Sequence, residues 1–238
     1  MDRVVDASEL LDGPLTEPAV LAGNLRDLRR VNRLLGGVAL SRAALDRLAP
    51  GPEPLTMIDV GTGAADIPVG LIQARRRQGR RLDVLATDDR QAILDAALAV
   101  DPGLRQVPGL RLAVADGLDL PYPDGAFDVG HVSLVLHHLG PADAVTLLRE
   151  LRRVARLGVV INDLDRTPLA LFGARLLARI ATRNRYTRHD APLSVRRAYR
   201  PGEARELLRA AGLRPVSEHR SFVGQRWAIA AVPIGGQG

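Results

Sequence analysis

The segment Asp59-Val60-Gly61-Thr62-Gly63-Ala64-Ala65-Asp66 joins a short apolar run, residues 55–58, to a stretch with helical character. A strand that leads through a glycine turn onto a helix N-terminus is typical of a nucleotide-cofactor cradle. A dinucleotide fingerprint would have a third glycine at position 66, where the helix meets the pyrophosphate. This chain has Asp66 there, and a carboxylate would repel a diphosphate. The acidic residues therefore indicate a cationic cofactor.

Acidic residues also follow the next apolar segments. Residues 82–87 predict a second strand that ends at Asp88, where an acid of a doubly wound sheet accepts two ribose hydroxyls. The third predicted strand ends at Asp116-Gly117, and the Asp116 carboxylate can accept from an adenine amino group. Ser133 lies in a fourth apolar run, residues 129–136, where its carbonyl can accept from an ammonium group.

With these motifs the chain resembles the class I S-adenosylmethionine-dependent methyltransferases over roughly residues 55–163, and within them the small-molecule, natural-product branch. The likeness rests on the order and spacing of the glycine loop, the strand-end acid, the Ala115-Asp116-Gly117 step, the L-P-x-P-D-G-x-F-D hairpin at 120–128 and the Leu136-His137-His138-Leu139 step. One departure is Ala65, where many members have a third glycine.

The resemblance implies S-adenosyl-L-methionine as cofactor and S-adenosyl-L-homocysteine as product. The sulfonium and ammonium groups of S-adenosyl-L-methionine suit the acidic cradle. The predicted cofactor-binding residues are Asp59, Gly61, Gly63, Asp66, Asp88, Asp116, Gly117 and Ser133. Simpler alternatives stay open for three of them: Asp59 as a brace of the glycine loop, Asp66 as a first-turn acid, and Ser133 as an ordinary buried strand residue.

Alternation of strands and helices from Leu55 onwards predicts an α/β fold with a mostly parallel sheet covered on both faces. The resemblance implies a Rossmann-like, seven-stranded methyltransferase sheet whose last strand is antiparallel. We expect helices over 64–78, 90–100, 141–156 and 201–211, a fifth strand at 158–161, and closing strands at 213–218 and 227–232.

The chain of 238 residues, 46% hydrophobic, predicts a single compact domain because no Pro/Gly/Ser-rich linker divides it. We expect an N-terminal arm and helical cap over 1–50, and a cofactor-binding domain over 51–238 that carries a cap insertion at 165–199. Residues 1–18 show little periodicity, which predicts a loosely held arm. The insertion reads as an amphipathic helix, with an apolar stripe over 169–180, followed by a polar cap loop at 182–190.

Composition narrows the chemistry. The chain has no cysteine, which excludes disulfides, thiolate zinc sites and a cysteine nucleophile. No metal site is predicted. The start Met1–Asp6 lacks a charged-then-apolar signal and no apolar run could span a bilayer, so a cytoplasmic location without a membrane span is expected.

Two neighbouring strands are expected to bring histidine and carboxylate together at the carboxyl edge of the sheet, where ligands bind in open parallel sheets. His137 and His138 follow the fourth strand, and Asp163 ends the fifth. Methyl transfer from a sulfonium mainly requires positioning of the acceptor. For a phenol or enol, His137 would act as general base, helped by Asp163. His138 is the second catalytic candidate, with packing on the following helix as its simpler role.

Residues 149–200 contain 13 arginines and four acids. Within them we predict that an acceptor contacts Tyr186, Arg188, His189, Arg196 and Arg197. For the four basic residues the alternatives are a solvated basic face and docking to an acidic carrier protein or nucleic acid, and for Tyr186 the alternative is an ordinary packing anchor.

The predicted function is O-methylation of a small phenolic or enolic secondary metabolite. C-methylation of a quinone or polyketide-like ring would use the same cleft, and a non-catalytic methyltransferase-fold subunit is a further alternative. RNA methylation is disfavoured by the Leu136-His137-His138 step and an aromatic content of 3%. A nicotinamide oxidoreductase is disfavoured by Asp66 and by the absence of lysine. A homodimer is compatible with the sequence.

Overall fold

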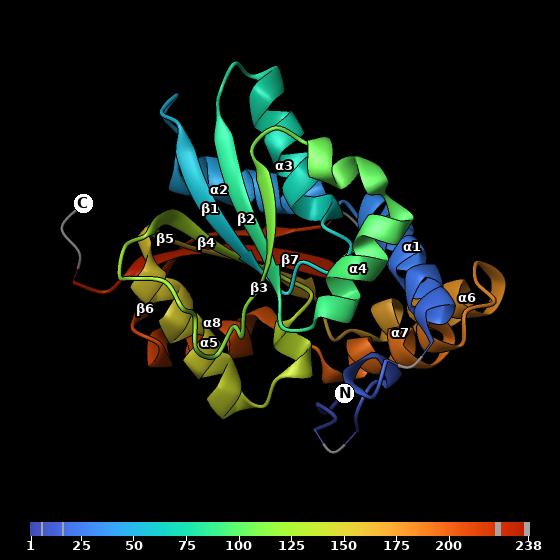
Figure 1. Cartoon of the computed structure of the whole chain (residues 1–238). Helices are drawn as coiled ribbons and strands as arrows, with labels where there is room; N and C mark the ends of the chain where they lie inside the picture. Colours follow the sequence, from blue (N-terminus) through green and yellow to red (C-terminus); the bar gives the residue numbers. More distant parts are fainter. Residues whose placement is uncertain (6, 16, 222–224, 236–238) are drawn as a thin grey trace.

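The computed structural model describes residues 1–5, 7–15, 17–221 and 225–235. Its centre is a seven-stranded sheet of order β3-β2-β1-β4-β5-β7-β6 (Figure 1). The strands are β1 (Leu55–Val60), β2 (Leu82–Asp88), β3 (Leu110–Val114), β4 (Phe127–Ser133), β5 (Ala155–Leu164), β6 (Leu213–Arg220) and β7 (Arg226–Pro233). The pairs from β3 through β5 are parallel, whereas β7 is antiparallel to β5 and β6. The predicted sheet is confirmed.

Two helical layers cover the sheet because successive strand residues point to opposite faces. Met57 packs in one core with α2 (Gly37–Leu48), α3 (Asp66–Arg77) and α4 (Gln91–Val100). Its neighbour Ile58 packs in the other core with α5 (Pro141–Val154) and α8 (Pro201–Ala210). In Figure 1, α2 and α3 lie above the sheet, and α5 and α8 below it.

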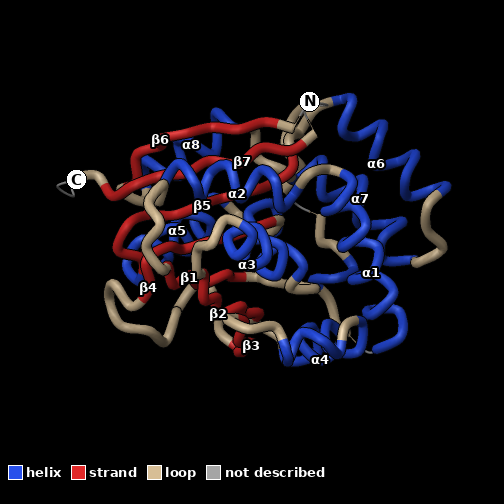
Figure 2. Tube along the Cα trace, turned by 90° about the horizontal axis from the view of Figure 1, so that it is seen from above, coloured by secondary structure: helices blue, strands red, loops and turns tan. Residues whose placement is uncertain are grey.

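A third group of helices gathers beyond one end of the sheet, where Figure 2 shows α1 (Pro18–Leu34), α6 (Pro168–Ile180) and α7 (Arg185–Arg197) together. The short helix η1 (Leu10–Asp12) of the N-terminal arm joins them. The other two short helices are η2 (Pro102–Gln106) and η3 (Leu136–His138). Both segments predicted as caps therefore lie at the same end of the sheet.

Two expectations about this cap are wrong. The polar stretch predicted as a loop at 182–190 is a loop only over 182–184, and residues 185–190 form the start of α7, because the side chain of Asn184 accepts from the backbone N–H groups of Tyr186 and Thr187 and caps the helix. The arm predicted to be loose is held: the N–H groups of Leu10 and Leu11 donate to the Asp190 carboxylate at 2.8 and 3.1 Å.

Helix α6 presents two different faces. Its small residues Ala170 and Ala178 are buried, whereas Leu169, Phe172, Leu176 and Ile180 are exposed. Among the described residues, no helix combines the length and apolar character needed to cross a bilayer.

Candidate active site

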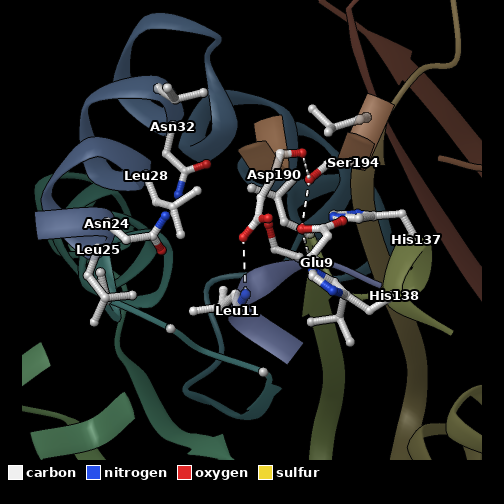
Figure 3. A pocket seen from close by; sticks show the side chains of 18 of the residues that line it. Glu9, Leu11, Asn24, Leu25, Leu28, Asn32, His137, His138, Asp190 and Ser194 are labelled. Carbon is white, nitrogen blue, oxygen red and sulfur yellow. Dashed lines mark hydrogen bonds and ion pairs between the residues drawn. The ribbon is translucent and has the colours of Figure 1, made fainter. Parts of the chain in front are cut away.

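A cavity of about 570 Å³ lies at the carboxyl ends of β1, β2 and β4, a volume usual for small-molecule sites. Its walls come from the sheet edge and from the arm, α1, α6 and α7 (Figure 3). All eight residues predicted to bind the cofactor line it: Asp59, Gly61, Gly63, Asp66, Asp88, Asp116, Gly117 and Ser133.

The glycine loop takes a left-handed path that brings its backbone against a neighbouring side chain. Gly61 has φ +69°, and a Cβ there would lie 2.3 Å from Cγ2 of Val135. Gly63 has φ +53°. Ala65, the departure from the family pattern, has φ 54° and so keeps the conformation that glycine favours, at a cost of about 1 kcal/mol.

Asp88 closes the loop from the end of β2. Its Oδ2 atom accepts from the N–H of Gly63 at 3.1 Å, and burial raises the pKa of Asp88 to about 7. Asp116 lies on the surface, and its Oδ1 atom accepts from the N–H of Leu118 at 2.8 Å. A carboxylate has several acceptor positions, so Asp88 can also accept from a ligand.

A buried cation organises the floor of the cavity. Arg226 is fully buried and donates to Asn162 Oδ1 at 2.5 Å, Asn32 Oδ1 at 2.7 Å and Ser133 Oγ at 2.8 Å. The amide of Asn32 in turn donates to both carboxylate oxygens of Asp66. Burial lowers the pKa of Arg226 to about 10, so the side chain stays charged at neutral pH. Asp66 and Ser133 are thus held by side chains from α1 and β7.

A second buried network supports Asp59. Its Oδ1 atom lies 2.5 Å from Nδ1 of His131, and Nε2 of His131 lies 2.9 Å from Ser41 Oγ. His131, Asn32 and Arg226 were not among the residues predicted for the site. Each is a polar residue in an otherwise apolar pattern: His131 in β4, Asn32 on the buried face of α1 and Arg226 at the start of β7. That interruption was the signal in the sequence that could have identified them.

His137 and Asp163 meet as predicted from the strand order. Nδ1 of His137 lies 2.7 Å from Asp163 Oδ1, and the backbone N–H of His137 donates to Oδ2 at 3.2 Å. Full burial alone would raise the pKa of Asp163, but the charge and hydrogen bond of His137 outweigh it and lower the pKa. His137 lines the cavity although its side chain is only 4% exposed.

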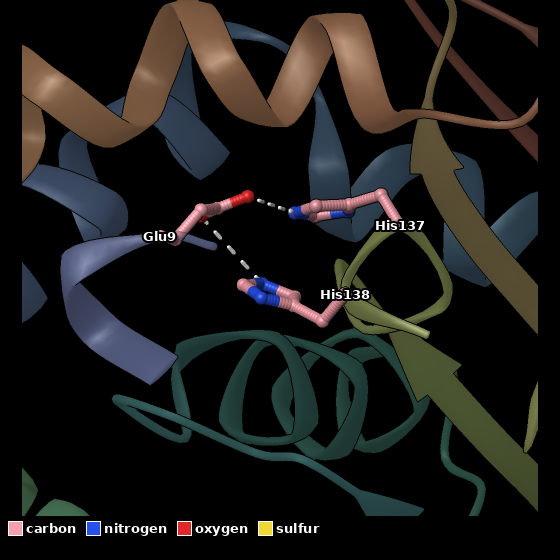
Figure 4. A group of neighbouring side chains, drawn as sticks. All are labelled: Glu9, His137 and His138. Atoms are coloured by element: carbon pink, nitrogen blue, oxygen red, sulfur yellow. Dashed lines mark ion pairs between the residues drawn. The ribbon is translucent and has the colours of Figure 1, made fainter. Parts of the chain in front are cut away.

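The arm adds an acid that the sequence did not suggest. Glu9 is buried, and its Oε1 and Oε2 atoms lie 3.8 Å from Nε2 of His137 and 3.9 Å from Nε2 of His138 (Figure 4). Burial raises the pKa of Glu9 to about 7. Nδ1 of His138 lies 2.7 Å from Asp12 Oδ1, so His138 contacts the arm. A single acid in an aperiodic segment carries no signal of this placement.

The five residues predicted to contact an acceptor are absent from the cavity lining: Tyr186, Arg188, His189, Arg196 and Arg197. The reason is the helical register of α7, which turns Thr187, Asp190, Ala191, Ser194 and Val195 toward the cavity instead.

Several of these five have structural contacts. Arg188 donates to the carbonyls of Ala178 and Arg179 at the end of α6. Arg197 donates to the carbonyls of His137 and His138 at 3.1 and 2.6 Å, which fixes the histidine step from behind.

The sequence comparisons agree with this geometry. Residues 58–161 match a family model described as a methyltransferase domain. The chain is 31% identical over 112 residues to ajmaline N-methyltransferase of Rauvolfia serpentina, covering 47% of this chain and 36% of that protein. It is 27% identical over 100 residues to the ubiquinone/menaquinone biosynthesis C-methyltransferase UbiE of Rickettsia akari (strain Hartford), covering 42% and 40%. The matched region spans less than half the length of either relative.

Solved structures show the same fold. A SAM-dependent methyltransferase from Aquifex aeolicus has a TM-score of 0.62 at 20% identity, covering 90% of this chain and 97% of that one. The O-methyltransferase NcsB1 from neocarzinostatin biosynthesis, in complex with S-adenosylhomocysteine and 1,4-dihydroxy-2-naphthoic acid, has a TM-score of 0.64 at 20% identity, covering 92% and 59%. Residues 58–161 thus match a methyltransferase domain, and the chain shares its fold with S-adenosylmethionine-dependent methyltransferases.

Proposed function

We propose that this protein transfers the methyl group of S-adenosylmethionine to an oxygen of a small phenolic or enolic molecule. The observation that carries the proposal is the buried His137–Asp163 pair, 2.7 Å apart, in a cavity whose floor is the glycine loop. A carboxylate that accepts from Nδ1–H leaves the Nε2 lone pair of a neutral imidazole free. That arrangement is the one a general base needs.

The cofactor half of the cavity suits the charges of S-adenosylmethionine. We assign the ribose hydroxyls to Asp88, the adenine amino group to Asp116, and the methionine ammonium to the region of Asp59, Asp66 and the carbonyl of Ser133. Positioned carboxylates at the ends of β1 and β2 suit a cofactor that carries a sulfonium and an ammonium. The glycine backbone of Gly61 and Gly63 gives the close approach that the methionine part requires.

In the mechanism that follows, the acceptor oxygen attacks the methyl carbon in line with the carbon–sulfur bond. The new oxygen–carbon bond forms as the carbon–sulfur bond breaks, and its electron pair stays on sulfur to give S-adenosylhomocysteine. His137 takes the hydroxyl proton at Nε2, and the carboxylate of Asp163 stabilises the resulting imidazolium. Asp163 is a positioning residue because it acts through His137.

The acceptor half of the cavity is mainly apolar. Helix α6 contributes Ala170, Ala174, Leu177 and Ala178, and α1 contributes Leu28 and Val31. An apolar wall beside the two imidazoles and the carboxylate of Glu9 favours a planar acceptor that carries a hydroxyl group. The matched relatives named above include an N- and a C-methyltransferase, so the assay must identify the methylated atom.

The test is release of S-adenosylhomocysteine by the purified protein with S-adenosylmethionine and a panel of phenols, enols, quinols, amines, carboxylates and total RNA. We expect turnover with phenols or enols, and a product methylated on oxygen. Turnover confined to RNA, or methylation on ring carbon or nitrogen, would contradict the proposal.

A further inference from the structure

Three side chains from two distant segments converge on one point of the cavity wall. Glu9, His137 and His138 each direct a potential metal-ligating atom to this point, and these atoms all lie within 4.8 Å of one another. The Nε2 atoms of the two histidines lie 3.8 and 3.9 Å from the Glu9 carboxylate oxygens. Those distances exceed a hydrogen bond, so no hydrogen bond fills the space between the acid and the rings (Figure 4).

Both imidazoles are oriented from their far side by a carboxylate. Nδ1 of His137 lies 2.7 Å from Asp163, and Nδ1 of His138 lies 2.7 Å from Asp12. A histidine that ligates a metal through one nitrogen usually donates its other N–H to such a partner, which fixes the tautomer and raises the basicity of the ligating nitrogen. Here two carboxylate–histidine pairs point their Nε2 atoms at the same acid.

Glu9 shows independently that the cluster is incomplete without a ligand. Its side chain is 3% exposed, and its Oε1 atom is buried without a hydrogen-bond partner, although Oε2 accepts from Ser194 Oγ at 2.9 Å. A buried carboxylate oxygen without a partner is costly. A guanidinium nitrogen of Arg197 lies 4.0 Å from Oε1 and donates to Asp12 at 2.9 Å.

We propose that Glu9, His137 and His138 bind a divalent transition-metal ion of the zinc type at the acceptor side of the cavity. Two imidazole nitrogens and one carboxylate oxygen are a donor set for such ions. In a tetrahedral zinc site, ligand atoms about 2.0–2.2 Å from the metal lie roughly 3.3 Å from one another. The three ligand atoms here lie within 4.8 Å of one another, so their separations need to close by up to about 1.5 Å.

Charge and access agree with this assignment. With neutral imidazoles, the carboxylates of Glu9, Asp12 and Asp163 outweigh the guanidinium of Arg197, and a dication neutralises the excess. Glu9, His137 and His138 all line the cavity, so a fourth position on the ion opens toward the acceptor. An open position is the mark of a catalytic zinc site.

The inference rests on the proposed function for the identity of the acceptor and replaces one of its steps, the proton transfer to Nε2 of His137, because that atom ligates the ion. In the metal-loaded protein His137 is a ligand, and the ion replaces it as the group that favours the acceptor anion. A phenol that binds the ion through oxygen loses its O–H proton to solvent. Its oxygen then forms the bond to the methyl carbon as the carbon–sulfur bond breaks, with the electron pair left on sulfur.

The test uses tag-free, full-length protein freed of metal by a chelator. Co²⁺ is titrated and its visible absorption followed, and Zn²⁺ binding is measured by calorimetry. We expect one ion per chain, a Co²⁺ spectrum of low coordination number, and at least tenfold weaker binding in Glu9→Gln and in His138→Gln. Asp12→Asn, which removes only the partner of His138, should weaken binding about 10–100-fold.

His219→Gln is the matched control, because His219 lies on β6 away from the cluster; it should bind Co²⁺ like wild type. Binding of S-adenosylhomocysteine shows that each variant is folded.

Equal Co²⁺ binding by wild type and by the Glu9→Gln/His138→Gln double variant would overturn the inference. If wild type binds no Co²⁺ and, after removal of metal, still methylates a phenol, the metal site is refuted while the proposed function stands. If Co²⁺ binds as expected and no acceptor turns over, the site stands and the proposed function fails.

Discussion

The strongest single perturbation of the cavity floor is Arg226→Met, which keeps the length of the buried side chain and removes its charge. Three acceptors lose their donor: Asn162 at 2.5 Å, Asn32 at 2.7 Å and Ser133 at 2.8 Å. A buried acceptor left without a partner costs about 1–3 kcal/mol, and removal of one partner from a buried charged network costs about 3–5 kcal/mol in all. We therefore expect the free energy of unfolding to fall by about 3–5 kcal/mol.

Urea unfolding followed by circular dichroism measures this loss. With an m-value of about 2–3 kcal/mol/M, the midpoint should fall by about 1–2 M at unchanged m. Affinity for S-adenosylhomocysteine should fall at least tenfold under conditions where the variant is folded, because Asn32, which donates to Asp66, loses the donor that fixes its own position.

The matched control is Arg205→Met, which removes an arginine that is 42% exposed and pairs with Glu218. Exposed pairs contribute about 0–1 kcal/mol, so this variant should unfold almost like wild type. If Arg226→Met also loses less than 1 kcal/mol, or keeps full cofactor affinity, the role assigned to the buried cation is refuted.

Three further perturbations test neighbouring parts of the site. Gly61 and Gly36 have φ of +69° and +70°, but of these two only Gly61 has a neighbouring side chain that an added Cβ would meet. Gly61→Ala should therefore weaken S-adenosylhomocysteine binding at least tenfold, measured by calorimetry. Equal affinity in the control Gly36→Ala and in Gly61→Ala would contradict the steric reasoning. Burial raises the pKa of Asp88 to about 7, and only its anion accepts strongly from both ribose hydroxyls, so affinity should rise about tenfold from pH 6 to pH 8. That rise should disappear in Asp88→Asn, and its persistence would exclude Asp88 as the titrating group. Asp190→Ala removes the acceptor for the N–H groups of Leu10 and Leu11, so trypsin should cleave the arm faster than in wild type; unchanged cleavage would mean that other contacts hold the arm.

The sheet and the cofactor side of the site could be predicted from the sequence because their signals are local. A glycine turn between an apolar strand and a helix fixes Gly61 and Gly63 at the strand end, and parallel order then brings Asp88 and Ser133 to the same edge. The meeting of His137 and Asp163 followed from strand adjacency alone.

The cap could not be predicted in the same way because long-range polar contacts decide it. Helix α7 buries Asp190 and Ser194 toward the arm, and no apolar periodicity marks that face. Glu9 reaches the histidines because Asp190 binds the backbone that follows it and Ser194 donates to its carboxylate. Arg226 was unpredictable as a buried cation, since its partners lie in α1, β4 and β5.

The most direct test of the central claim compares wild type and His137→Ala with methyl-¹³C S-adenosylmethionine and an active phenol from the panel. We expect a ¹³C-methyl group on the phenolic oxygen, turnover lowered about 10²-fold or more in the variant, and nearly unchanged affinity for S-adenosylhomocysteine. Equal turnover in the two proteins would contradict the role of His137 and leave positioning alone as the means of catalysis. A ¹³C-methyl group on ring carbon would contradict O-methylation.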